Sequence, residues 1–135
     1  IEVFLQNELA AGRLDCQFTS PASSIFIHGH CHQKALFGTK AMKDILARVE
    51  NLEILEADTG CCGMAGSFGY EKEHVEISEK IGELALFPAL RKLSGETLVV
   101  ANGFSCRHQI SDFLGKKAVH WVEAIEVGLG RFREV

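Results

Sequence analysis

Residues 59–69 read Thr-Gly-Cys-Cys-Gly-Met-Ala-Gly-Ser-Phe-Gly, so two adjacent cysteines stand among four glycines. Neighbouring side chains of an extended chain point to opposite sides, and the backbone must bend at Cys61 and Cys62 to aim both sulfurs into one site. Glycine supplies the φ and ψ values for such a bend and lets the backbone approach a bulky group closely. Because an ordinary turn needs one glycine, we interpret this loop as one wall of a metal or redox site.

The flanking sequence alternates between strand and helix patterns. Short β-branched and aromatic runs predict strands at residues 24–28, 52–57, 97–101 and 118–120. Apolar residues at helical spacing predict helices at residues 2–11, 39–50, 71–93, 105–114 and 122–129. In the helix at 71–93, Ile77, Ile81, Leu84 and Leu86 are expected to face the core and Pro88 to break or kink the end. Residues 12–24 are expected to form a polar connection.

This alternating order predicts an α/β fold of three layers, in which a short parallel sheet of about four strands is flanked by helices. The cysteines Cys31, Cys61, Cys62 and Cys106 each come just after the end of a predicted strand. In a parallel sheet the functional crevice lies outside the carboxyl ends of the strands. We therefore expect these four sulfurs to meet at the carboxyl-terminal edge of the sheet, with Cys16 as a bystander.

Four thiolates at one edge suit zinc, copper(I) or an iron–sulfur cluster. Structural zinc usually uses paired C-x2-C knuckles, which this sequence lacks. Backbone N–H groups of a glycine-rich loop suit a cluster, since its sulfides accept hydrogen bonds. The residues alone leave open zinc, dithiol redox chemistry, a vicinal disulfide between Cys61 and Cys62, four inert thiols, and a phosphate cradle built from the glycines.

Several further residues are candidates for supporting roles. Histidine titrates near neutral pH, so His30 and His32 beside Cys31 are candidates for ligands or a proton relay. His108, two residues after Cys106, is a candidate ligand in place of a further cysteine. His28 is expected in the core. The loop backbone at Gly60, Gly63 and Gly66 is expected to shape the site. Lys34 and Arg107 could balance negative charge there.

Composition limits the class of protein. The 135 residues predict a single domain (1–135), with a formal net charge of -4 and no long basic run, which argues against nucleic acid as the main partner. No apolar stretch approaches the roughly 20 residues of a membrane helix. The odd count of five cysteines, with an adjacent pair, fits an intracellular protein better than a secreted disulfide framework. We expect a cytoplasmic protein whose chain begins inside a longer polypeptide.

The motifs around the cysteines resemble the cysteine-rich CCG domain of heterodisulfide reductases and of glycolate oxidase iron–sulfur subunits. The matching stretches are His28-Gly29-His30-Cys31-His32-Gln33-Lys34, then Cys61-Cys62-Gly63-Met64-Ala65-Gly66-Ser67-Phe68-Gly69-Tyr70, and Gly103-Phe104-Ser105-Cys106-Arg107-His108-Gln109. The residue sequence of these motifs is most similar to the C-terminal part of FAD-linked 2-hydroxyacid dehydrogenases, of the D-lactate, glycolate and D-2-hydroxyglutarate type.

The resemblance implies an electron-transfer role for the chain. An iron–sulfur cluster, expected as [4Fe-4S], would be held by the four cysteines and would receive electrons from FAD in an upstream domain. The partners would be the flavin and ferredoxin-like parts of the same polypeptide, and the isolated domain would be inactive on the hydroxyacid. The whole enzyme could associate peripherally with the inner face of the membrane. The alternatives are a zinc-stabilised or metal-free docking module and a thiol–disulfide site of the heterodisulfide reductase type.

One position departs from the family pattern. The last motif of the family is C-x2-C, and here Gly103 stands in the place of its first cysteine, leaving Cys106. The heterodisulfide reductase version holds a noncubane double cluster with five cysteines. The four that remain here fit a single ordinary cluster or a zinc ion.

Overall fold

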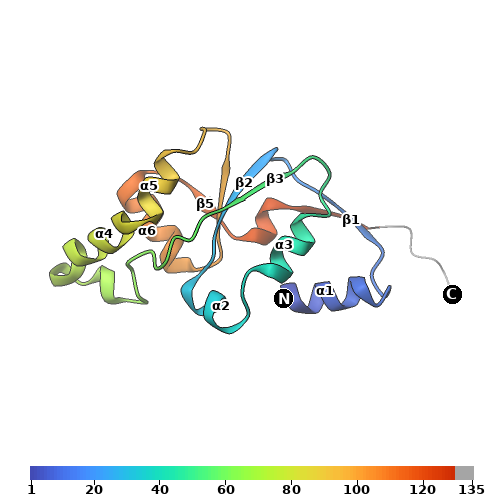
Figure 1. Cartoon of the computed structure of the whole chain (residues 1–135), viewed down its shortest axis with the longest axis horizontal. Coiled ribbons are helices and arrows are strands. Elements are labelled where there is room, and N and C mark those ends of the chain that lie inside the picture. The colour runs from blue at the N-terminus through green and yellow to red at the C-terminus, as the bar shows by residue number, and fades with distance from the viewer. Residues whose placement is uncertain (130–135) are drawn as a thin grey trace.

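The computed structural model describes residues 1–129 (Figure 1). The helices are α1 (Glu2–Ala10), α2 (Cys31–Leu36), α3 (Lys40–Leu46), α4 (Val75–Leu84), α5 (Leu86–Arg91) and α6 (Phe104–Leu114). The strands are β1 (Cys16–Thr19), β2 (Ser24–His28), β3 (Glu53–Glu56), β4 (Leu98–Ala101), β5 (Ala118–Val119) and β6 (Glu126–Leu129). Short 3-10 turns are η1 (Phe68–Tyr70), η2 (Lys72–His74) and η3 (Trp121–Ala124).

A four-stranded parallel sheet forms the centre, in the order β3-β2-β4-β5. This confirms the predicted α/β class and all four predicted strands of the sheet. The chain enters at β2, continues to β3 on one side, and then returns to β4 on the other side. Connections therefore leave the carboxyl ends of β2 and β4 in opposite directions, which opens a crevice between them.

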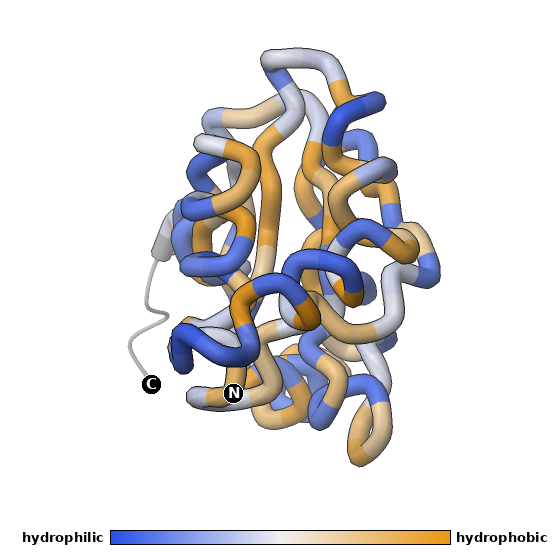
Figure 2. The backbone as a smooth tube through the Cα atoms, turned by 90° about the vertical axis from the view of Figure 1, so that its left-hand side faces the viewer, coloured by the Kyte–Doolittle hydropathy of each residue, from blue (hydrophilic) through white to orange (hydrophobic). Residues whose placement is uncertain are grey.

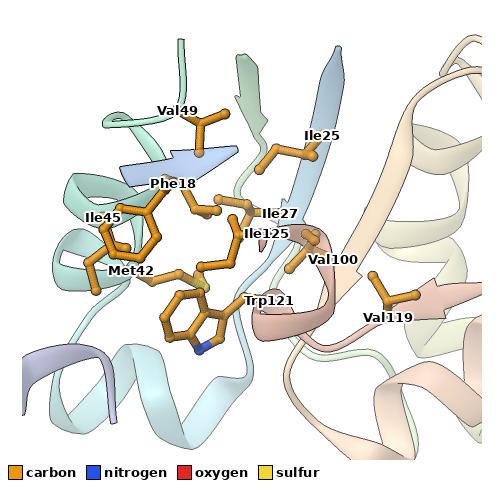
Figure 3. Close-up of a cluster of buried hydrophobic side chains, with 12 residues drawn as sticks. Phe18, Ile25, Ile27, Met42, Ile45, Val49, Val100, Val119, Trp121 and Ile125 are labelled. Carbon is orange, nitrogen blue, oxygen red and sulfur yellow. The ribbon is translucent and has the colours of Figure 1, made fainter. Parts of the chain in front are cut away.

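Alternate strand residues feed two cores, one on each face of the sheet, because successive side chains point to opposite faces. Ile25 and Ile27 pack with Trp121 on the face covered by α3, and Figure 3 shows these side chains converging. Phe26 packs with Leu86 and other residues of α5 and α6 on the opposite face. In Figure 2 the inner strands carry much of the hydrophobic colour, as expected for a sheet covered on both sides.

The prediction of one long helix at residues 71–93 is wrong, because the segment divides into η2, α4 and α5. The break falls at Ala85, four residues after Ile81, with φ -151°. Pro88 has no N–H to offer the carbonyl of Leu84, and its ring would clash there, so the helix ends at that residue. Ile77 and Leu84 are exposed at 49% and 82%, contrary to the predicted inner face.

The inner face of α4 instead consists of small residues. Ser78 and Gly82 are its buried positions. A Cβ added to Gly82 would lie 2.5 Å from the ring of Phe87, so glycine allows α4 and α5 to pack closely. The apolar spacing of the segment was therefore misleading about which face touches the core.

A second sheet was not predicted. Residues 12–24 contain β1, and residues 122–129 form η3 and β6 in place of the predicted helix. β1 and β6 pair antiparallel, with Cys16 opposite Leu129 and Thr19 opposite Glu126. Branched residues and Gly128 weaken the helical tendency of the last segment. Helix α2 was also missed, since six residues show too few turns for a clear period.

Candidate metal centre

All four predicted cysteines line one cavity of about 380 Å³ at the carboxyl edge of the sheet. Cys31 begins α2 directly beyond β2, and Cys106 lies in the first turn of α6 beyond β4. Cys61 and Cys62 reach the cavity from the loop after β3. The expectation that strand ends would gather these thiols thus agrees with the geometry. Cys16 lies elsewhere, in β1, and lines a different cavity.

Burial divides the four thiols into two pairs. Cys62 and Cys106 are 3% and 2% exposed and form the inner wall. Cys31 is exposed and Cys61 is half-buried, so they form the side that faces solvent. All four are free thiols, and the vicinal disulfide between Cys61 and Cys62 is not formed. A group bound here would be anchored from inside and reachable from outside.

The glycine loop is held in place by a buried polar contact with α4. The Ser78 hydroxyl donates to the carbonyl of Gly63 over 2.8 Å, and the amide of Gln109 in α6 donates to Ser78 Oγ over 2.9 Å. A Cβ on Gly63 would lie 2.1 Å from the Ser78 carbonyl oxygen, and its φ is +100°. Gly63 is therefore required both for its backbone conformation and for close approach.

The same loop directs its backbone toward sulfur. The N–H of Gly63 donates to Cys61 Sγ over 3.3 Å. Such donors stabilise a thiolate or a metal-bound sulfur. Gly60 and Gly66 have φ values of +55° and +71° with open space around them, so they serve the turn and not a close packing contact.

The two inner sulfurs shift each other's pKa in opposite directions. The Cys106 thiol, with a smaller contribution from His28, lowers the pKa of Cys62 to about 4. The same neighbour, together with burial, raises the pKa of Cys106. Burial also raises the pKa of Cys61, against the effect of the Gly63 N–H. The lowered pKa of Cys62 favours its thiolate form, and metal binding would displace the proton that the raised pKa keeps on Cys106.

The predicted histidines fall into different places. His30 and His32 line the cysteine cavity, with ring centroids 5.6 Å apart. They also line a neighbouring cavity with His120. His108 is absent from the cavity lining among the described residues and instead lies against the ring of Phe104, with centroids 4.3 Å apart. This placement offers no support for His108 as a replacement ligand.

Gly103 leaves room for His30. A Cβ at Gly103 would lie 2.3 Å from Cδ2 of His30 and 2.9 Å from Cys106 Sγ. The imidazole of His30 thus occupies the space next to Cys106 that a side chain at position 103 would fill. Glycine at position 103 thus accompanies a histidine ring on the same wall of the cavity as Cys106.

The two basic candidates contact backbone carbonyls. Lys34 Nζ donates to the carbonyl of Gly60 over 3.2 Å, so it steadies the cysteine loop. Arg107 Nη1 donates to the carbonyls of Ala101 and Asn102 over 2.8 and 2.9 Å, at the end of β4. Both residues therefore stabilise the backbone around the site, Lys34 at the cysteine loop and Arg107 at the end of β4.

The sequence reasoning missed His28 as a site residue, although its expected burial is correct at 1% exposed. His28, Cys62 and Cys106 place one ligand atom each within 4.8 Å of one another. The signal was available, since His28 ends β2, whose carboxyl end also carries Cys31. A strand end that supplies one ligand is a reasonable place to look for another.

The donor set fits a soft metal or an iron–sulfur cluster. Sulfur and imidazole donors are those that zinc and iron–sulfur groups accept, and the inner wall is shielded from water. A backbone N–H already points at one of the sulfurs. Within residues 1–129, no helix has the length and apolarity that a membrane crossing requires.

Comparison with known proteins shows that the chain is similar in sequence to parts of oxidoreductases. The D-2-hydroxyglutarate dehydrogenase of Escherichia coli (strain K12) is 34% identical over an alignment of 131 residues, and the match covers 91% of this chain and 12% of that protein. The enzyme of the same name from Pseudomonas putida is 32% identical over 126 residues, covering 92% of this chain and 12% of the enzyme. A subunit of the anaerobic glycerol-3-phosphate dehydrogenase of Escherichia coli (strain K12) is 33% identical over 88 residues, covering 64% of this chain and 21% of that subunit.

The chain thus spans about 12% of the length of the D-2-hydroxyglutarate dehydrogenases that it matches. Its homologues are dehydrogenases or dehydrogenase subunits, in agreement with the expected relationship to 2-hydroxyacid dehydrogenases. No family model matches the sequence. No solved structure matches it either.

Proposed function

We propose that this chain holds an iron–sulfur cluster in its cysteine cavity and transfers electrons within an FAD-linked 2-hydroxyacid dehydrogenase. The observation that carries the proposal is the convergence of Cys31, Cys61, Cys62 and Cys106 on one cavity from three separate connections. Similarity to dehydrogenases supports an electron-transfer role. A cluster would supply a one-electron carrier between a flavin and an acceptor.

The residues of the chain have distinct tasks in this proposal. Cys62 and Cys106 anchor the group from the buried side, and Cys31 and Cys61 close it on the solvent side. The Gly63 N–H donates toward Cys61 and favours added negative charge there. The exposed side offers the short path by which electrons would enter and leave. The electron donor and acceptor would be other parts of the enzyme.

The thiol–disulfide alternative is less well supported by the burial of the inner pair. Cys62 carries the lowered pKa that suits a nucleophilic thiolate, and Cys106 lies beside it. However, both sulfurs are almost completely buried, so a disulfide substrate would not reach them. The solvent-facing pair is accessible, but burial raises the pKa of Cys61.

Iron and acid-labile sulfide analysis of the anaerobically purified chain tests the proposal. We expect iron and sulfide in equal amounts and broad visible absorption that bleaches on reduction. Cys62→Ala should lose both, while Cys16→Ser, which changes a cysteine outside the cavity, should retain them. Zinc alone, without visible absorption, would refute the cluster. A complete enzyme that keeps its turnover with Cys62→Ala would favour the docking module.

A further inference from the structure

His28 is a buried side chain whose hydrogen bonding is incomplete. Its imidazole is 1% exposed, at the last position of β2. Nδ1 lies 2.6 Å from Oγ1 of Thr59, whereas Nε2 has no hydrogen-bond partner. Buried polar atoms are nearly always satisfied by protein, water or an ion, so an unpartnered ring nitrogen indicates a missing neighbour.

The surroundings of this ring indicate what the neighbour is. One ligand atom from each of His28, Cys62 and Cys106 lies within 4.8 Å of the others, and all three residues are buried. An ion with bonds of about 2.0 to 2.3 Å in tetrahedral geometry needs ligand atoms about 3.6 Å apart. Small side-chain rotations therefore bring these three atoms to the spacing of ligands on a single ion, or any two of them to the spacing of two ligands on one iron of a [2Fe–2S] cluster.

Thr59 supplies the contact that a ligating histidine usually has. A metal-bound imidazole nearly always donates its other N–H to an oxygen, which fixes the tautomer and the ring plane. Thr59 is 2% exposed and belongs to the loop that carries Cys61 and Cys62. When Nδ1–H donates to Thr59 Oγ1, the lone pair of Nε2 is free for a metal.

We propose that His28 is a metal ligand through Nε2, and that it forms with Cys62 and Cys106 the inner, nitrogen–sulfur half of the site. This inference rests on the proposed function only in that the cavity holds a metal. The group would be a thiophilic centre of mixed ligation, an iron–sulfur cluster or a single soft divalent ion. With five donors, one of the outer thiols, Cys31 or Cys61, would be in excess of the four that such centres take, so the site of the proposed function would then use three of its four cysteines together with His28.

The mixed ligation has a consequence for redox behaviour. Replacement of cysteine by histidine in [2Fe–2S] centres raises the reduction potential, because a neutral nitrogen replaces a thiolate. An iron–sulfur centre held by His28 should therefore be easier to reduce than the same centre held by cysteines alone. A change of His28 to cysteine would lower its potential.

Cadmium-113 added as the metal alone to the chain, labelled with nitrogen-15 at its histidines, gives a direct test. We expect the cadmium signal to show coupling to one histidine Nε2, assigned to His28 through its contact with Thr59. This measurement needs no variant and remains decisive if substitutions in β2 disturb folding. Coupling to His30 or His32, or to no histidine, would overturn the inference.

Variants provide the matched comparison. His28→Gln should weaken cobalt(II) binding at least tenfold and change its visible spectrum, while His108→Ala, at a histidine that does not line the cavity, should change neither. Thr59→Val should weaken affinity about 10- to 100-fold, the usual effect of losing a partner of the ligand. Binding that ignores His28→Gln would refute the role of His28 and leave the proposed function intact. A native chain that binds no metal would refute the proposed function itself.

Discussion

Replacement of Gly63 by alanine tests how the cysteine loop is held. The new Cβ would lie 2.1 Å from the Ser78 carbonyl oxygen, and the backbone at φ +100° suits glycine. The conformational cost for a residue with a Cβ is about 1–2 kcal/mol. Displacement of the loop from α4 adds an overpacking cost of about 1–3 kcal/mol, and weakening of the bond from Ser78 to Gly63 adds about 1 kcal/mol. These terms sum to about 3–6 kcal/mol, and the lower entropy of the unfolded alanine chain offsets about 0.4–1 kcal/mol, so the expected loss of unfolding free energy is about 3–5 kcal/mol.

Gly60→Ala is the matched control. Gly60 also has a positive φ, +55°, but a Cβ there meets nothing within 4 Å. Its cost is the conformational one, partly offset by the lower entropy of the unfolded alanine chain, so about 0.5–1 kcal/mol remains. The two variants share the change in residue type and differ in the contact with α4.

Calorimetry of the reduced, metal-free chain measures the difference. The unfolding entropy is about 2.1 cal/mol/K per residue. For a chain of 135 residues, each kcal/mol lost from the unfolding free energy therefore lowers Tm by about 3.5 °C. Gly63→Ala should therefore lower Tm by about 10–17 °C and Gly60→Ala by about 2–4 °C. Equal shifts for the two variants would refute the contact between the loop and α4 as the reason for glycine at position 63.

Two further predictions address the core and the inner thiols. Trp121→Ala removes a fully buried ring from the cluster on the α3 face and should cost about 3–5 kcal/mol by urea unfolding, whereas a cost below about 1 kcal/mol would show that the cluster is not packed as described. In the metal-free chain, the pKa of about 4 for Cys62 predicts a thiolate at about pH 6, well below the usual thiol pKa. Cys106→Ala removes the neighbour that lowers this pKa, so the ultraviolet thiolate absorbance at about pH 6 should fall; unchanged absorbance would contradict the effect of Cys106 on the pKa of Cys62.

The strands of the central sheet and the meeting of the cysteines could be predicted because both follow from local patterns. Residues 24–28 and 97–101 are apolar runs long enough to identify as buried strands, and parallel strands bring their carboxyl ends to one edge. The position of Cys31 or Cys106 after such a run was therefore informative about three-dimensional placement.

Other features depend on contacts that a local pattern does not contain. β1 and β6 are four residues each and pair across more than a hundred positions, so neither segment shows its partner. The inner face of α4 uses Ser78 and Gly82, because the glycine loop and Phe87 approach it closely. Hydrophobic spacing alone favoured Ile77 and Leu84, which face outward.

In the candidate site, too, some features could be predicted from local sequence and others depend on contacts in the folded chain. Its thiols could be predicted from their places in the chain, but the gradient from buried Cys62 and Cys106 to exposed Cys31 could not. His28 was expected to be an ordinary core residue. Its unpartnered nitrogen becomes evident once Thr59 is seen to occupy the other side of the ring.

X-ray absorption at the iron edge of the anaerobically reconstituted chain tests the central claim most directly. A cluster held by this cavity predicts a first shell dominated by sulfur and a second iron scatterer at short range, both lost in Cys62→Ala and retained in Cys16→Ser. A first shell of oxygen and nitrogen without a neighbouring iron, or a spectrum indifferent to Cys62→Ala, would contradict it.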